Sequence, residues 1–171
     1  MKTKKEEQMK SSLHELFLDE LKDIYYAENL LAKTLPEMAE ASTAAPLKKA
    51  FQGHLKETQN QIKRLEQVFK LLDEKAEAKK CDAMEGLVKE AKSLIKEHEA
   101  GLTRDVGIII GAQKVEHYEI AAYGSLATLA DLMGHTDVKE LLGETLNEEK
   151  ATDEKLTEVA LNFVNEKAAA E

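Results

Sequence analysis

Apolar residues return every three or four positions along four long stretches of the chain, which is the spacing of amphipathic α-helices. The stretches cover about residues 12–38, 46–72, 103–133 and 136–163. Pro46 lies where a proline is favoured, in the first turn of the second helix. Pro36 falls inside the first pattern and is expected to kink that helix or loosen its last turns. The pattern therefore predicts four long helices.

The links between these helices are short, long and short. The long link, residues 74–102, holds an amphipathic piece of its own, "CDAMEGLVKEAKSLIKEHEAG", which Gly101 is expected to end. Ser12 with Glu15, and Asp82 with Glu85, have the spacing of capping boxes. Short links make neighbouring helices antiparallel, whereas the long link is able to return along the length of a bundle. We expect an all-α protein: a ferritin-like four-helix bundle with one long crossover that carries an additional short helix.

Size and composition fit this fold. The chain has 171 residues, the size of one ordinary domain, and 33% of them are charged while 5% are aromatic. Ala, Leu, Glu and Lys are strong helix formers. We expect a single domain over residues 1–171 with its core at about 12–166, and flexible ends at 1–11 and 167–171.

Charge and apolar content exclude several classes of function. A formal net charge of −9 argues against nucleic-acid binding, which needs a basic face. The lysine-rich start is not followed by an apolar run typical of a signal peptide, and no stretch is long enough for a membrane span. The one cysteine, Cys81, has no partner for an internal disulfide. We expect a cytoplasmic protein without nucleic-acid or membrane partners.

Acidic side chains fall within the apolar faces of the helices. In "EHYE", Glu116 and Glu119 are three residues apart and so share one face of the third helix. Projection of the other helices places further polar residues inward or at the margin of the apolar face: Glu20 and Glu28 on the first, His54, Glu57 and Gln61 on the second, and Glu148, Glu149 and Asp153 on the fourth.

Buried carboxylates must protonate, pair with cations or bind metal. The two arginines, Arg64 and Arg104, are not at the helix level of these acids in the projection, and the lysines map to outer faces. Acids at one level on four helices, with a histidine, are the arrangement of di-metal carboxylate bundles. Carboxylate oxygens in such sites suit Fe and Mn.

Taken singly, each of these residues has a simpler interpretation. Glu20 or Glu148 alone is more often a boundary residue that reaches water, and His54 alone is more often a hydrogen-bonded core histidine. His117 lies on the flank of the third helix. The usual metal site also has two Glu-x-x-His motifs, whereas this chain has the reverse order in "HLKE" and no histidine in "EKATD". The choice between Glu148 and Glu149 stays open at this point.

The chain resembles the YciE/YciF family of bacterial stress-associated, ferritin-like proteins. The resemblance extends from Leu13 to about residue 166 and rests on "DIYYAENLL", "HLKETQNQIKRLEQVF", "CDAMEGLVKEA", "AQKVEHYEIAAYGSLATLA" and "ETLNEEKATDEKLT". It implies a homodimer and a rubrerythrin-like centre of two Fe or Mn ions per chain. The ligands that the resemblance implies are Glu28, His54, Glu57, Glu116, Glu119, Glu149 and Asp153.

Two functions compete at this stage. In the first, the protein binds a di-metal centre under stress, with oxidase or peroxide-detoxifying chemistry on O2 or peroxide. In the second, it is a non-enzymatic stress-response bundle that works as an oligomer or binding partner and keeps a vestigial site. The chain lacks a cysteine pair for a rubredoxin-type electron-transfer centre, and iron storage would need a hollow shell that the sequence does not indicate.

Overall fold

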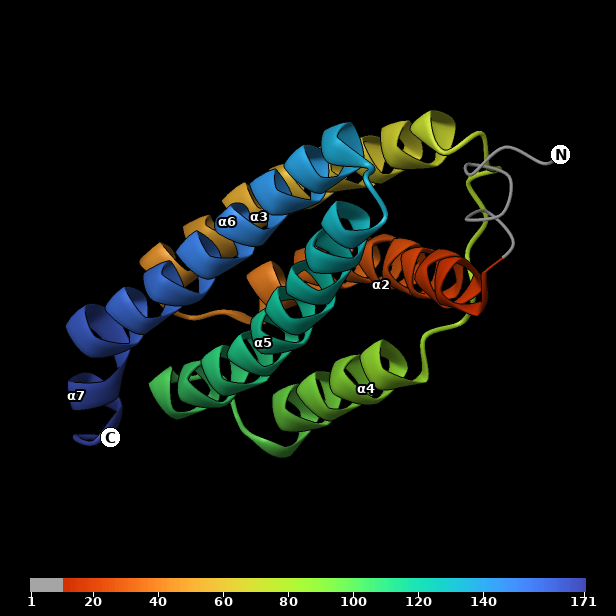
Figure 1. Cartoon of the computed structure of the whole chain (residues 1–171). Helices are drawn as coiled ribbons and strands as arrows, with labels where there is room; N and C mark the ends of the chain where they lie inside the picture. The colour runs from red at the N-terminus through yellow and green to blue at the C-terminus, as the bar shows by residue number, and fades with distance from the viewer. Residues whose placement is uncertain (1–10) are drawn as a thin grey trace, which may run out of the picture.

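A computed structural model describes residues 11–171, and within them every regular element is helical. The elements are α2 (Ser12–Ala41), α3 (Ala45–Leu71), α4 (Asp82–Glu97), α5 (Leu102–Leu132), α6 (Thr136–Val159), the π-helical turn η1 (Ala160–Val164) and α7 (Asn165–Ala168). The four long helices are α2, α3, α5 and α6, and α4 follows α3 and precedes α5 in the chain (Figure 1). The predicted helices are confirmed.

The helices form a bundle with one long crossover. Short turns join α2 to α3 and α5 to α6, and these two pairs share the most extensive contacts. Across the pairs, Arg64 of α3 contacts Glu144 of α6, while the earlier residue Glu57 contacts the later residue Thr152, so α3 and α6 are antiparallel. Because α3 and α5 consequently point in the same direction, their link must return along the bundle. This is the predicted ferritin-like connection.

Helix α4 lies against α5 and α2 on the outside of the bundle (Figure 1). Close packing against α5 depends on small residues: a Cβ added at Gly111 would lie 3.4 Å from the Cβ of Ala91. The start of α4 is fixed by Cys81, whose sulfur accepts a hydrogen bond from the backbone N–H of Met84 at 3.3 Å. The crossover therefore carries a packed helix.

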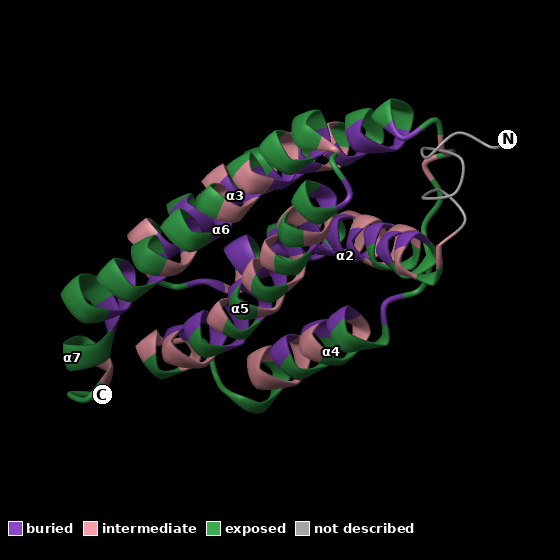
Figure 2. Cartoon of the chain, in the orientation of Figure 1, coloured by how far each residue is buried: buried purple, intermediate pink, exposed green. Residues whose placement is uncertain are grey.

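Buried residues line the inward faces of the long helices (Figure 2). The largest fully buried side chains include Phe17, Phe51 and Phe69 beside Tyr123 and many leucines. None of the helices in residues 11–171 combines the length and the apolar character that crossing a membrane requires.

The helix ends are held by groups from other helices. Both carboxylate oxygens of Asp105, a fully buried residue of α5, accept backbone N–H groups before α3, from Thr43 at 2.8 Å and Ala44 at 2.6 Å. Glu171 does the same for the first turn of α5, through Leu102 at 2.9 Å and Thr103 at 3.0 Å. These carboxylates satisfy orphan donors and complement the helix dipoles.

Two predicted helix caps are wrong. Ser11, not Ser12, caps α2 by accepting from His14 N–H at 3.1 Å. Asp82 does not begin a capping box, because Cys81 holds that position. Helix α2 continues through Pro36 to Ala41, and the expected kink at Pro36 stays a prediction. Expected flexibility at residues 1–10 lies outside the described residues.

Candidate metal centre

Three helices bring together, inside the bundle, four side chains of the kinds that can ligate a metal. His54 comes from α3, Glu116 and Glu119 from α5, and Glu149 from α6. One ligand atom of each lies within 4.8 Å of one ligand atom of each of the others. Glu116 and Glu119 reach the same place because residues three apart share a helical face.

These side chains are almost completely removed from water. The exposed fraction is 0% for Glu116, Glu119 and Glu149 and 4% for His54. Glu28 of α2 is also 0% exposed and its charge opposes ionisation of Glu119. We call these five residues, His54, Glu28, Glu116, Glu119 and Glu149, the carboxylate cluster.

The imidazole of His54 lies between two carboxylates of the cluster. Its Nδ1 is 3.5 Å from Oε1 of Glu116, and its Nε2 is 3.8 Å from Oε2 of Glu149. Burial lowers the pKa of His54 to about 4, and the nearby charge of Lys155 acts in the same direction. The imidazole is therefore neutral at pH 7, the form with a nitrogen lone pair that binds metal.

The carboxyl groups of the cluster resist ionisation in the absence of a cation. Burial raises the pKa of Glu28, Glu116 and Glu119 well above the usual value, and repulsion between the carboxylates raises it further. Burial also raises the pKa of Glu149. Such shifts are typical of acids that share a dry site without a positive charge.

Many polar atoms of the cluster have no hydrogen-bond partner. Both carboxylate oxygens of Glu116, Glu119 and Glu149 are buried and without one. One oxygen of Glu28 and the Nε2 atom of His54 are also buried without a hydrogen-bond partner. Buried polar groups in proteins are ordinarily satisfied. Orphaned oxygens that converge with one imidazole nitrogen fit a metal cation.

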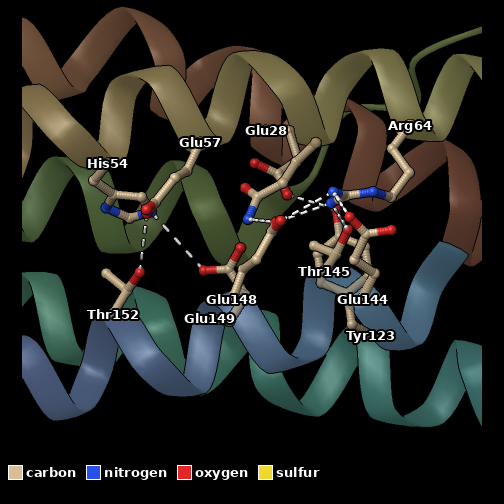
Figure 3. A network of polar contacts seen from close by, with 11 residues as sticks. Glu28, His54, Glu57, Arg64, Tyr123, Glu144, Thr145, Glu148, Glu149 and Thr152 are labelled. Atoms are coloured by element: carbon tan, nitrogen blue, oxygen red, sulfur yellow. Dashed lines mark hydrogen bonds and ion pairs between the residues drawn. The ribbon is translucent and has the colours of Figure 1, made fainter.

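Glu28 has one hydrogen-bond partner in the interior. The hydroxyl of Tyr123 on α5 donates to its Oε1 at 2.5 Å (Figure 3). Tyr123 is itself 0% exposed. It follows Glu119 by four residues, which places both side chains on one helical face. The i, i+4 spacing of Glu119 and Tyr123 is the signal in the sequence that places this hydroxyl on the inward face.

Glu57 and Asp153, two of the seven predicted ligands, lie outside the cluster. Glu57 is exposed, and its carboxylate accepts a long hydrogen bond from Thr152 at 3.4 Å. The Asp153 side chain is 21% exposed and contacts His117 at 3.3 Å. Their role as ligands stays a prediction. His117 is on the helix flank, as expected, with its side chain 70% exposed.

Arg64 lies at the level of the acids, contrary to the projection. Its guanidinium donates to both oxygens of Glu148, at 2.8 and 2.9 Å, and to Glu144 and Thr145 (Figure 3). Burial would raise the pKa of Glu148, but the hydrogen bonds from Arg64 and Gln61 hold it below its usual value. Arg64 thus neutralises Glu148 and leaves Glu149 in the cluster.

Glu20 does not point inward as the projection of the first helix indicated. It is exposed and lines a surface hollow next to Asp23 and Tyr118. The projection gives the face of a helix, but it does not give the depth at which that face is covered by its neighbours. On α2 the inward acid is Glu28 alone.

Comparisons with known proteins agree with this architecture. The family described as "Domain of unknown function (DUF892)" matches residues 12–169. Protein YciF of Escherichia coli (strain K12) is 48% identical over 158 residues, which are 92% of this chain and 95% of that protein. The crystal structure of the E. coli stress protein YciF superposes with a TM-score of 0.87 at 47% identity, over 91% of this chain and 98% of that one. YcfI from Rhodopseudomonas palustris has a TM-score of 0.84 at 45% identity, over 86% and 94% of the two chains.

Proposed function

This chain belongs to the DUF892 family, and we propose that it is a stress-associated protein that binds two Fe or Mn ions in the carboxylate cluster. The stress role is proposed from its similarity to the E. coli stress protein YciF. Metal binding is proposed from one observation: the convergent oxygens of Glu116, Glu119 and Glu149 are buried without any hydrogen-bond partner.

Charge balance supports a pair of divalent ions. Fully ionised, Glu28, Glu116, Glu119 and Glu149 would carry four negative charges in a dry interior. Two divalent cations carry the same charge with the opposite sign. Because the energetic cost of burying unpaired charge is severe, neutralisation at this place would strongly favour the ionised, metal-bound state.

The donor set supports Fe or Mn. Carboxylates suit hard cations, while the single imidazole of His54 favours Fe or Mn over Ca²⁺ or Mg²⁺, which prefer oxygen ligands only. The thiolates that soft metals prefer are absent from the cluster. His54, Glu116, Glu119 and Glu149 would hold one ion, and Glu28 together with the shared carboxylates would hold the second.

The surrounding residues would position these ligands. Tyr123 donates to one oxygen of Glu28 and so leaves the other free for metal. Arg64 holds Glu148 outside the cluster. When bound, such ions supply Lewis acidity and one-electron chemistry toward O2 or peroxide. The protein's own contribution would be a dry site that excludes other reactants.

Metal analysis of protein purified without chelators tests the proposal. We expect about two Fe or Mn ions per chain in the unmodified protein. Glu149→Gln should lose most of this metal, because it replaces an anionic ligand by a neutral amide. The neighbouring Glu148→Gln is the matched control and should keep its metal, since Arg64 already occupies that carboxylate.

Two results would contradict this function. One is a protein that stays free of metal even after incubation with Mn²⁺ or Fe²⁺ under reducing conditions. The other is an equal loss of metal in both variants, which would show that binding does not depend on the cluster.

A non-enzymatic bundle is the second candidate, and one observation favours it. The raised pKa values of Glu116 and Glu119, which follow from burial, would let a metal-free protein keep these groups protonated and neutral. In that case Glu116→Gln should leave the free energy of unfolding unchanged or higher. Added Mn²⁺ should then change the stability of neither the unmodified chain nor the Glu116→Gln variant.

A further inference from the structure

Within the carboxylate cluster, His54 is the most exposed residue. Its exposed fraction is 4%, against 0% for the four glutamates. It also lines a small hollow between α3 and α6, together with Glu57, Thr152 and Lys155. The volume of this hollow is about 10 Å³, which is roughly the space that one water molecule needs. The hollow is therefore a narrow opening that ends at a buried metal-ligating side chain.

The opposite end of the polar interior is held much more firmly. There Arg64 donates to Thr145 at 2.7 Å and to both oxygens of Glu148 at 2.8 and 2.9 Å, and Gln61 donates to Glu148 at 3.0 Å. Figure 3 shows these bonds around Arg64 at one end, and His54 with Glu57 and Thr152 at the other. An ion that passed the Arg64 end would have to break several charge-assisted hydrogen bonds and approach a guanidinium.

At the His54 end, the hydrogen bond between two residues that line the hollow, Thr152 and Glu57, is weak, and the apolar side chains of Phe51 and Leu156 also line it. The Thr152 hydroxyl donates to Glu57 at 3.4 Å, which is longer than an ordinary O–H···O hydrogen bond. Glu57 is exposed, so its side chain is free to rotate toward water or toward the hollow at little cost. Opening this contact would leave the imidazole of His54 at the floor of the hollow.

The narrow opening also sets a chemical requirement. A hydrated divalent cation is larger than one water molecule, so it must lose water before it passes. A carboxylate at the mouth would replace part of that water with oxygen ligands of the kind that Mn and Fe bind. Glu57 is in this position, whereas the Lys155 ammonium at the same mouth repels cations.

We propose that the hollow between α3 and α6 is the route by which metal reaches the cluster, and that Glu57 is the first ligand, which captures the cation and passes it to His54. This inference rests on the proposed metal-binding function. It gives Glu57 a role in the rate of uptake, and none in the final coordination.

The test measures the rate of Co²⁺ uptake by the chelator-treated full chain, followed by the absorbance of protein-bound Co²⁺ after rapid mixing at low ionic strength. Glu57→Gln preserves the shape of the side chain and should slow uptake about threefold to tenfold through the lost charge. Lys155→Gln removes the repelling charge and should accelerate uptake by a similar factor. The amount of Co²⁺ bound at the end should be the same in both variants and in the unmodified chain.

Glu154→Gln is the matched control for the loss of one negative charge. Glu154 is exposed on α6 and does not line the hollow, so its uptake rate should be that of the unmodified chain. Equal rates for Glu57→Gln and Glu154→Gln would overturn the proposed route. A loss of bound Co²⁺ at equilibrium in Glu57→Gln would also overturn it, because Glu57 would then be a permanent ligand. An unmodified chain that binds no Co²⁺ would contradict the metal site itself and the route with it.

Discussion

Tyr123 and Tyr25 each donate a hydrogen bond to a glutamate, in opposite surroundings. Tyr123 bonds to the fully buried Glu28, whereas Tyr25 bonds to Glu66 in an exposed position, at 3.0 Å. A buried carboxyl that loses its one partner bears the full desolvation penalty, while an exposed one regains a hydrogen bond from water. The tyrosine hydroxyl therefore contributes more to the stability of the fold at Tyr123 than at Tyr25.

This difference gives a prediction at the scale of single residues. In chelator-treated protein, Tyr123→Phe should lower the free energy of unfolding by about 1–3 kcal/mol, because it orphans Glu28. Tyr25→Phe should lower it by less than half as much. Urea denaturation at pH 7 measures both. Equal losses in the two variants would show that the hydrogen bond to Glu28 has no special weight in stability.

The two adjacent glutamates on α6 show what the sequence leaves undecided about single residues. Glu148 and Glu149 are separated by about 100° around the helix, and both fell near the inward arc. Glu149 is 0% exposed inside the cluster, while the side chain of Glu148 is 31% exposed and bound to Arg64. The choice depended on the position of Arg64 on α3, a residue far away in the sequence.

At the scale of helices, each end depends on a distant part of the chain. Asp105 and Glu171 both accept two backbone N–H groups at a helix start, but Asp105 is buried and Glu171 is exposed. Neither cap is local in sequence to the helix that it satisfies. Periodicity thus located α3 and α5, but it did not indicate what holds their ends.

The matched carboxylates give a prediction for these ends. Asp105→Ala should lower the free energy of unfolding by about 2–3 kcal/mol, since it leaves two donors beside α3 without their charged acceptor. Glu171→Ala should cost much less, because water replaces an exposed carboxylate. Thermal or urea denaturation of both variants measures the difference. A larger loss from Glu171→Ala would contradict the assigned roles.

At the scale of the whole molecule, the carboxylate cluster draws its side chains from four helices, α2, α3, α5 and α6. A cation bound to α3, α5 and α6 would be released on unfolding, so its binding energy adds to the stability of the entire bundle. The metal-free fold must instead hold buried acids that repel one another. Loaded and metal-free proteins should therefore differ in global stability and not only in local order.

Thermal melting checks this expectation. Mn²⁺ at about a hundredfold excess over its dissociation constant should raise the melting midpoint of the chelator-treated protein by about 5–10 °C. Glu149→Gln should show little shift under the same conditions, and Glu148→Gln should shift like the unmodified protein. A midpoint that does not respond to Mn²⁺ or Fe²⁺ would favour the non-enzymatic bundle. The homodimer implied by the family resemblance stays a prediction.

The sequence by itself determined the four long helices, the short–long–short links and the inward position of Glu28, His54, Glu116 and Glu119. Helical periodicity carries this information, because it fixes which side chains share a face. The tertiary structure decided the rest: it selected Glu149, placed Arg64 on Glu148, and left Glu57 outside at the mouth of the hollow. These outcomes depend on how deeply one helix covers another and on which side chains meet across the bundle. The hydrophobic periodicity of a single helix indicates neither the depth of coverage nor these contacts between helices.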